Sequence, residues 1–347
     1  MTENEEAGRR ALAPKLSFGY LYDFRNPPQW QRPWADLYAE ILDFIAWSET
    51  VGFEGAWVPE HHGAEDGYMP SPLVALAAIA ARTRRIRLGS AIALAPLYHP
   101  VRFAEESAVL DILSNGRVEM ALAIGYRRRE ADAYGVDFGK RGARFDEFLH
   151  IVRALWAGET VTFAGKHYSV TNAAIMPPPP RGHVPLYIGG FAEKALERVA
   201  KYADGYFGNE EVCSLYAEKL RAEGKDPADA RIRIQGLFVT VANDPDAAME
   251  ELAPYFLHVN NSYGVWLNED RASGIDDPML KPMTLEQFKT SGILKILTPG
   301  QAIDYFRAMR ARISVEHFMM MLPPGFPPSL FVKYAELFAN EVIPAFR

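Results

Sequence analysis

Apolar positions along the chain alternate between two periodicities. Short apolar runs that are typical of buried strands recur, and each is followed by a stretch with an apolar residue every three or four positions. In 36–52, for example, Leu37, Ile41 and Phe44 share one helical face, and Gly52 stands where a helix would end. The pattern predicts strands at 15–21, 53–58, 86–94, 117–125, 184–190, 204–209, 231–242 and 315–322.

Helical patterns follow these strands. They lie at 36–52, 72–83, 100–114, 143–157, 192–203, 212–223, from 244 onward, and 328–340. Eight strand–helix units over 347 residues predict an α/β protein built as a (β/α)8 TIM barrel, and favour it over an open doubly wound sheet. We expect one such domain over residues 1–347.

Two insertions interrupt the alternation. Residues 159–170 alternate apolar and polar side chains around a glycine, which predicts a hairpin. Residues 259–297 are long, polar and irregular, and a compact domain rarely keeps such a loop without a use. The functional interpretation is a mobile lid, and the alternative is a variable surface loop.

Composition narrows the function classes. The net charge of −7 argues against nucleic acid and anionic membrane as partners, because both require a basic surface. Cys213 is the single cysteine, so a reducing compartment is expected. The polar, acidic N-terminus does not resemble a signal peptide, and the apolar run 73–81 is too short to span a bilayer. We therefore expect a cytoplasmic protein.

The sequence Glu60-His61-His62 directly follows the second strand. In this fold the active site lies at the carboxyl ends of the strands, so the three residues should face the barrel mouth. Neighbouring side chains on an extended segment diverge, which disfavours a metal shared by both histidines, and no metal motif supports one. Acid–base work or a hydrogen bond to a ligand suits one histidine of the pair, and the alternative is a structural, hydrogen-bonded pair. If His61 has the acid–base role, His62 could be a substrate contact or a structural residue. We expect Glu60 to orient one of the rings.

Arginines gather after the fourth strand. Tyr126 is followed by three arginines at 127–129, and Arg144 lies at the start of the helix predicted at 143–157. Arginine at a barrel mouth is typical of an anion clamp, and the alternative is a solvated charged loop. We expect the solvated alternative for two of the three residues at 127–129, and a clamp at Arg144.

A glycine pair, Gly189-Gly190, ends the fifth strand and leads into a helix through Phe191 and Ala192. Glycine permits close backbone approach and a helix N-terminus favours an anion, although a tight turn explains the pair equally well. Since the sequence contains neither a P-loop nor a dinucleotide fingerprint, a ligand with one phosphate and the size of FMN is more natural than NAD.

At these residues the chain resembles the bacterial luciferase-like flavin-dependent monooxygenases. The resemblance is carried by EHH at 60–62, by 88–117, 125–138 and 141–149, and by the C-terminal segments LTPGQAIDYFRAM and NEVIPAFR. It implies a flavin-binding barrel that forms a homodimer or higher homo-oligomer through helices near the second and third.

The resemblance also implies roles for individual residues. His61 matches the catalytic histidine, His99 matches a pocket histidine, and Arg144 matches the arginine that holds the flavin phosphate. Ala91–Ile92 matches a non-proline cis peptide beneath the flavin. The phosphate turn matches Gly190, Phe191 and Ala192, with Gly189 before it.

The chain also departs from the luciferases. Ala123 stands where they have a reactive cysteine near the flavin, and Ile124 stands where they have an arginine. The phosphate turn lacks their Ser or Thr. These differences argue against light emission and the luciferase substrate, but not against flavin binding.

The implied reaction uses reduced FMN from a separate flavin reductase, together with O2, to oxygenate a small apolar substrate such as an aldehyde or ketone. Aromatic residues expected near the mouth agree with an apolar substrate: Tyr22, Phe24, Trp57, Tyr98 and Trp266. The alternatives are a hydride-transferring oxidoreductase that uses deazaflavin, a flavin-binding protein without turnover, and a barrel metallohydrolase.

Overall fold

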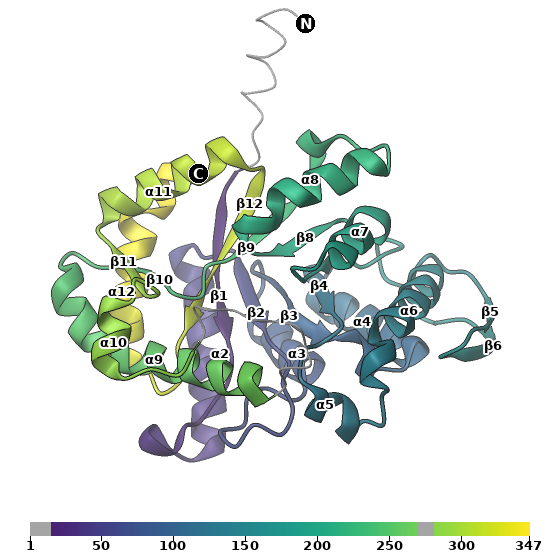
Figure 1. Ribbon diagram of the computed structural model, residues 1–347, viewed down its shortest axis with the longest axis horizontal. Coiled ribbons are helices and arrows are strands. Elements are labelled where there is room, and N and C mark those ends of the chain that lie inside the picture. The colour runs from purple at the N-terminus through teal and green to yellow at the C-terminus, as the bar shows by residue number, and fades with distance from the viewer. Residues whose placement is uncertain (1–14, 270–280) are drawn as a thin grey trace, which may run out of the picture.

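The fold is seen in a computed structural model that describes residues 15–269 and 281–347. Parallel strands close into a barrel in the order β1-β12-β9-β8-β7-β4-β3-β2 (Figure 1). β1 pairs with both β12 and β2, so the ring has no free edge. The barrel strands are β1 (Ser17–Tyr22), β2 (Gly55–Val58), β3 (Arg87–Leu94), β4 (Val118–Ala123), β7 (Leu186–Ile188), β8 (Gly205–Gly208), β9 (Ile232–Gln235) and β12 (Val315–Leu322). The predicted (β/α)8 barrel is confirmed.

Helices surround the barrel (Figure 1). They are α2 (Trp34–Val51), α3 (Pro72–Arg82), α4 (Pro100–Ser114), α5 (Arg128–Ala133), α6 (Arg141–Trp156), α7 (Glu193–Tyr202), α8 (Cys213–Ala222), α9 (Pro245–Glu269), α10 (Leu285–Thr290), α11 (Pro299–Arg312) and α12 (Pro328–Glu341). Short 3-10 turns lie at Pro28–Trp30, Ala95–Leu97, Phe138–Lys140, Glu210–Val212, Pro227–Asp229 and Ile343–Phe346.

Local sequence explains where several helices begin and end. Pro72 and Pro100 occupy first-turn positions, where the missing N–H leaves no helical hydrogen bond unmade. Thr298 caps α11 through a reciprocal capping box with Gln301. Gly52 ends α2 with a φ of 109°, a left-handed conformation that glycine adopts without steric cost.

The predicted hairpin is confirmed, since β5 (Val161–Ala164) and β6 (Ser169–Ala173) pair antiparallel. The prediction of one continuous strand at 231–242 is wrong. It divides into β9, which belongs to the barrel, and β10 (Val239–Val241), which pairs with β11 (Lys295–Leu297) outside it. The division falls at Gly236, where a Cβ atom would lie 1.9 Å from the Phe318 ring, so the backbone passes this ring closely.

The irregular segment predicted at 259–297 is also wrong over much of its length. Residues 259–269 are the last turns of the continuous helix α9, and α10 and β11 occupy part of the remainder. Val259 and Trp266 are buried at helical spacing, a pattern that the neighbouring polar residues conceal in the sequence. Residues 270–280 of the predicted lid lie outside the described residues.

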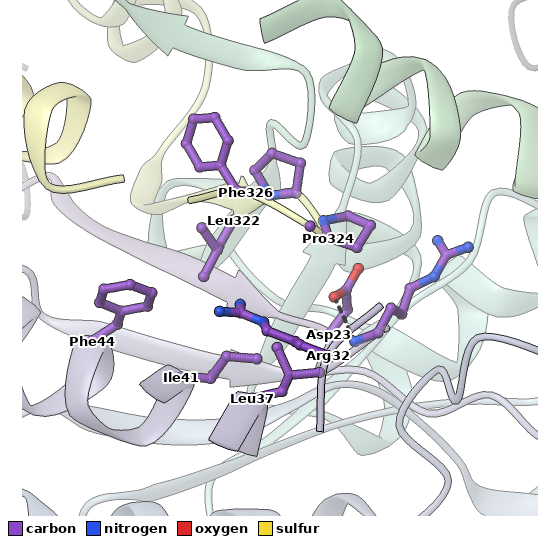
Figure 2. A pocket seen from close by; sticks show the side chains of 11 residues that line it. Asp23, Arg32, Leu37, Ile41, Phe44, Leu322, Pro324 and Phe326 are labelled. Atoms are coloured by element: carbon purple, nitrogen blue, oxygen red, sulfur yellow. Dashed lines mark hydrogen bonds between the residues drawn. The ribbon is translucent and has the colours of Figure 1, made fainter. Parts of the chain in front are cut away.

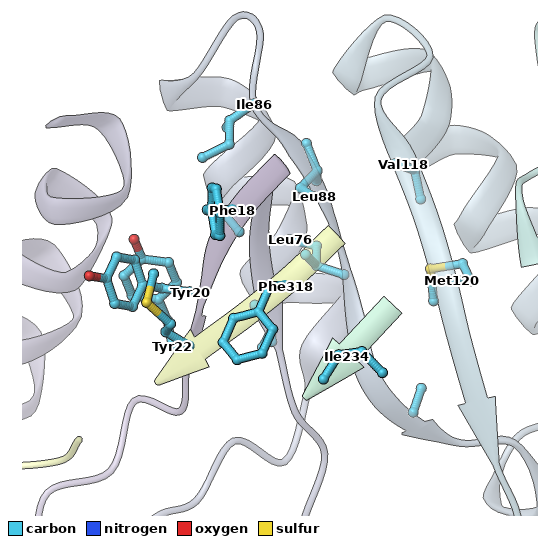
Figure 3. Packing of buried hydrophobic residues seen from close by; sticks show 14 of the residues in the cluster. Phe18, Tyr20, Tyr22, Leu76, Ile86, Leu88, Val118, Met120, Ile234 and Phe318 are labelled. Carbon is cyan, nitrogen blue, oxygen red and sulfur yellow. The ribbon is translucent and has the colours of Figure 1, made fainter. Parts of the chain in front are cut away.

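Buried side chains form two principal layers. Phe18, Tyr20 and Tyr22 point outward from β1 into the layer between the strands and the helices (Figure 3). Leu21 points inward, where it joins Trp57, Met319 and others inside the barrel. This alternation follows from the twofold side-chain period of a strand.

No helix in the described ranges combines the length and the apolarity that crossing a lipid bilayer would require.

Candidate active site

The segment after β2 places Glu60, His61 and His62 at the carboxyl end of the barrel, with all three buried. The two histidine rings diverge, as we expected. His61 Nδ1 lies 2.8 Å from Glu130 Oε1, whereas His62 Nε2 lies 2.9 Å from Glu60 Oε1. Each histidine therefore has its own carboxylate, and each uses a different ring nitrogen to contact it.

Glu130, in the first turn of α5, is the carboxylate that contacts His61. Its Oε1 also accepts hydrogen bonds from the backbone N–H of His62 at 3.0 Å and from Arg127 Nη1 at 3.2 Å. Burial raises the pKa of Glu130, but the hydrogen bond and charge of His61, with the other two donors, outweigh burial and hold the pKa below its usual value. Glu130 is therefore ionised at neutral pH.

Glu60 holds His62 and the end of β3. Its Oε1 also accepts from the Tyr98 hydroxyl at 2.9 Å, and its Oε2 accepts from the backbone N–H of Leu94 at 2.7 Å. The second nitrogen of His62, Nδ1, lies 3.0 Å from the Tyr134 hydroxyl. Both nitrogens of His62 are thus engaged by protein groups, and Glu60 orients this ring.

Aromatic rings surround His61. The centroid of its ring lies 4.7 Å from that of Tyr68, 5.6 Å from Tyr126 and 5.1 Å from Trp266. Tyr263 lies 6.0 Å away, and its hydroxyl is 2.6 Å from that of Tyr68. We call these four residues, Tyr68, Tyr126, Tyr263 and Trp266, the aromatic cluster. The Tyr126 hydroxyl is buried and has no hydrogen-bond partner in the described part of the chain.

Helix α9 supplies Tyr263 and Trp266 and covers the barrel mouth. Val259, one turn earlier, is fully buried among the side chains inside the barrel. The guanidinium of Arg127 lies 4.4 Å from the centre of the Trp266 ring, and that of Arg25 lies 5.5 Å from it. Cations at these distances from an indole ring are attracted by its electron-rich face.

A polar network ties α9 to the barrel loops. Arg25 Nη2 donates to Ser262 Oγ at 2.6 Å and pairs with Asp66 Oδ2 at 2.6 Å. His258 Nε2 lies 2.9 Å from the same Asp66 oxygen. Burial raises the pKa of Asp66, but its hydrogen bond with His258 and the charge of Arg25 outweigh burial and lower the pKa to about 2. Asp66 is therefore an ionised anchor for α9 at neutral pH.

Arg144 lies in a second group, at the rim. Its Nε donates to the carbonyl of Pro96 at 2.8 Å, and its guanidinium lies 4.2 Å from the centre of the Tyr168 ring. The exposed His99 ring lies 6.0 Å from the same tyrosine. The hairpin supplies Tyr168, and Glu147 holds it by accepting from the backbone N–H of Lys166, His167 and Tyr168.

The turn at 189–192 lies between β7 and α7. A Cβ atom at Gly189 would be 2.2 Å from Ile92 Cδ1, so the absence of a side chain at Gly189 makes room for the Ile92 side chain. Gly190 has a φ of +138°, and Ala192 precedes α7 without a side-chain cap. The peptide bond between Ala91 and Ile92 is cis, as the resemblance implies.

An ion pair joins helix α6, which carries Arg144, to helix α7, which follows the turn at 189–192. Arg198 of α7 donates from Nε and Nη2 to the two carboxylate oxygens of Asp146 on α6, at 2.6 and 3.1 Å. The second turns of α6 and α7 are therefore in contact, just after Arg144 in α6.

Residues 16–310 match the family model of the luciferase-like monooxygenases. The chain belongs to this family. Among proteins similar to it is the oxygenase component of the flavin-dependent trigonelline monooxygenase of Acinetobacter baylyi, 25% identical over 91% of this chain and 92% of that one. The F420-dependent glucose-6-phosphate dehydrogenase of Beutenbergia cavernae is 31% identical over 69% of this chain and 73% of its own.

Solved structures share the fold of this luciferase-like chain. The crystal structure of the monooxygenase RslO1 from Streptomyces bottropensis matches it with a TM-score of 0.80 and 22% identity, covering 95% of this chain and all of that one (100%). A likeness at this identity shows the fold alone.

The luciferase-like barrel brings some predicted site residues together and separates others. His61, Tyr126 and Trp266 meet in one cluster, whereas Arg144 and His99 lie at the rim. Ala123 is half-buried at the end of β4 and pairs with Leu94 in the adjacent strand. Phe191 is 52% exposed, and Ala192 is exposed beside it.

Tyr22 is a correction. We expected it near the substrate, but its side chain points away from the mouth into the outer core (Figure 3). Its hydroxyl donates to Ser48 Oγ on α2 at 3.2 Å, and its ring packs on Phe331 of α12. The physical reason is strand alternation, because Leu21 takes the inward position at this end of β1.

Sequence reasoning missed Glu130 and Tyr68. Of the three arginines at 127–129, it expected two to be solvated: Arg128 and Arg129 are exposed, and Arg127 is buried. The same stretch carried a signal for Glu130, because a carboxylate three residues after a buried arginine in a short helix faces the same side. No local pattern marks Tyr68.

Proposed function

We propose that this chain is the oxygenase component of a two-component monooxygenase. It would use reduced FMN from a separate flavin reductase, together with O2, to oxygenate a small apolar substrate such as an aldehyde or ketone. The observation that carries the proposal is His61, whose ring is held by the ionised Glu130 inside an aromatic cluster at the barrel mouth.

The residues at the rim fit an FMN-sized group. Arg144 and the uncapped N-terminus of α7 supply a guanidinium and free backbone N–H groups for one phosphate. When bound, reduced FMN supplies the electrons that activate O2.

The chain's own residues would orient the substrate, exclude water and move a proton. Tyr68, Tyr263 and Trp266 line the space around His61 with rings, which favours an apolar substrate and keeps bulk water away. His61 Nε2 would accept or donate the proton at the reacting oxygen. Glu130 would compensate the charge that the imidazole gains.

A second candidate is a hydride-transferring oxidoreductase that uses the deazaflavin cofactor F420. It is favoured by the likeness to the F420-dependent dehydrogenase of Beutenbergia cavernae. The absence of a dinucleotide fingerprint from the sequence fits both candidates and argues against direct use of NADH.

The test is substrate-dependent oxygen uptake by the pure protein with FMN, NADH and an added flavin reductase. Candidate aldehydes and ketones should increase oxygen consumption and yield oxygenated products only when both proteins are present. Substrate oxidation with F420 but no oxygen uptake would establish the second candidate instead. Rapid NADH oxidation by the protein alone would contradict both.

We also propose that the protein forms a homodimer through α3 and α4. These neighbouring helices expose four large apolar side chains: Val74, Val109, Ile112 and Leu113. Contiguous exposed apolar surface commonly marks an interface. Sedimentation should give a dimer for the wild type and a monomer for the Val109→Glu/Leu113→Glu variant, and a wild-type monomer at high concentration would contradict the proposal.

A further inference from the structure

We infer that Glu130 is a positioning residue that fixes His61 as the Nδ1–H tautomer and leaves Nε2 as an acceptor facing the aromatic cluster. The inference rests on the proposed function for its catalytic meaning. The tautomer itself can be measured independently of any activity.

The contacts of Glu130 determine which nitrogen of His61 carries the proton. Oε1 accepts from the backbone N–H of His62 and from a guanidinium N–H of Arg127, neither of which can accept in return. Three donors on one oxygen are compatible with a carboxylate, which has only acceptors to offer. The 2.8 Å contact with His61 therefore requires the proton to be on Nδ1.

The opposite side of the His61 ring is open for chemistry. No described residue makes a hydrogen bond to Nε2, and the side chain as a whole is 8% exposed, so this nitrogen is available at a largely buried ring. The nearby Tyr126 hydroxyl is buried and equally without a partner in the described ranges. A reacting O–H group can thus be bound at Nε2 and steadied by Tyr126.

The proton transfer that follows is balanced. The O–H bond of the reacting group breaks, its electron pair stays on the oxygen, and the proton moves to the lone pair of Nε2. The imidazolium formed has Glu130 on its other nitrogen, the arrangement by which a buried carboxylate stabilises a histidine base. In a later step Nε2 returns the proton.

His62 provides the internal contrast. Its Nε2 is held by Glu60 and its Nδ1 by Tyr134, so it has no nitrogen left for a substrate. Because different carboxylates bind the two adjacent histidines, His61 keeps one nitrogen available for a substrate and His62 does not.

The experiment is NMR of the 15N-histidine-labelled protein at about pH 9, where histidine side chains are generally neutral. The His61→Gln variant identifies the His61 signals. In the wild type, Nδ1 should show the shift of a protonated nitrogen and Nε2 that of an unprotonated one. Glu130→Ala should move His61 toward the Nε2–H tautomer, whereas Glu60→Gln should change the His62 signals only.

Glu130→Gln is the conservative variant, in case Glu130→Ala does not fold. The amide oxygen can keep the bond from Nδ1, and the amide NH2 takes the place of Oε2, which has no partner in the described chain. This variant should keep the wild-type tautomer but lose the compensating charge. Its kcat for oxygenation should fall about tenfold or more, with FMN affinity and KM within about twofold of wild type.

Three outcomes would overturn the inference: a wild-type Nε2–H tautomer, an unchanged tautomer in folded Glu130→Ala, or wild-type kcat in both variants. Failure of the proposed function is distinct. It would appear as the expected tautomers in a wild type that oxygenates no substrate with FMN and reductase.

Discussion

Two buried networks of charged residues occupy opposite ends of the barrel. At the base, Arg233 binds Glu119 through both Nη atoms and Glu316 through Nε. At the mouth, Arg25 binds Asp66, and Arg127 binds Glu130. Both networks pair arginines with carboxylates, but they differ in how many of their buried polar atoms have a hydrogen-bond partner.

The side chains of the Arg233 network at the base have all their buried polar atoms paired. His317 Nε2 accepts from Trp57 Nε1 at 2.8 Å, and its Nδ1 lies 2.8 Å from Ser17 Oγ. Burial, with the charges of Arg87 and Arg233, holds the pKa of His317 well below its usual value, so the ring is neutral. A Cβ atom at Gly55 would lie 2.6 Å from this ring, which shows how tightly the base is filled.

The network at the mouth, in contrast, has polar atoms without a hydrogen-bond partner. Buried atoms without a hydrogen-bond partner in the described chain gather there: Asp23 Oδ2, Arg25 Nη1, Asp66 Oδ1, Tyr126 OH and Glu130 Oε2. Folded proteins rarely leave buried polar atoms unpaired, because each costs about 1–3 kcal/mol. We infer that the packing completed at the base serves stability and that the groups left open at the mouth are available to a ligand. The predictions below test this division.

The largest effect is expected at His61. His61→Ala should lower oxygenation by about 10²–10⁴-fold, the usual contribution of a general acid or base, while FMN still binds. His62→Ala should lose much less turnover and mainly stability, because its contacts with Glu60 and Tyr134 are structural. Oxygen uptake and FMN affinity are measured for both variants in parallel. An inactive His62→Ala beside a nearly normal His61→Ala would reverse the assignment.

Arg233→Met should affect stability rather than chemistry. It leaves Glu119 and Glu316 buried without their shared partner, which costs about 3–5 kcal/mol of unfolding free energy. Urea titration measures the loss. Arg231→Met is the matched control, since Arg231 also binds Glu316 but its side chain is 41% exposed, and it should cost about 1 kcal/mol or less. Equal losses would mean that burial of the base network is unimportant.

Arg144→Ala tests the rim. If Arg144 holds the FMN phosphate, its removal should weaken FMN binding by about 1.5–3 kcal/mol, the size of a charged hydrogen bond. Equilibrium dialysis measures the dissociation constant. The exposed Arg129→Ala controls for loss of one positive charge near the mouth. An unchanged affinity in Arg144→Ala would reduce this residue to its contacts with Pro96 and Tyr168.

The smallest effect is a pH slope from Asp23, which lines a cavity of about 10 Å³ between β1, α2 and the segment after β12 (Figure 2). Burial raises the pKa of Asp23 from 3.8 to about 7. The folded protein thus holds a proton that the unfolded chain releases near pH 4, so this residue makes stability fall as the pH rises from about 4 to 7.

Asp23→Asn should remove this slope, which is about 1.4 kcal/mol per pH unit at most for one carboxyl group. Unfolding free energies between pH 4 and 8 measure it, with the exposed Asp36→Asn as the control for loss of one charge. The same slope in Asp23→Asn and wild type would show that Asp23 is ionised in the folded protein.

Much of the fold follows from local pattern. Strand and helix periodicities predicted the barrel, and alternation around a glycine predicted the hairpin near 159–170. The sequence also predicted that His61 and His62 follow a strand and that their side chains point in different directions. All of these features depend on residues that are neighbours in the sequence. The helical end of α9 was missed because its polar and glycine residues hide the spacing of Val259, Tyr263 and Trp266.

The sequence by itself determined the order of strands and helices, the position of the Glu60-His61-His62 segment at the barrel mouth, and the resemblance to the luciferase-like family. Tertiary structure decided which carboxylate each histidine meets, that Tyr22 belongs to the outer core, and that α9 brings Trp266 onto His61. Glu130 lies 69 positions from His61, and the pair forms only when the β2 and β4 ends meet in the closed barrel. Periodicity records which face of an element is buried, but not which distant side chain it is buried against.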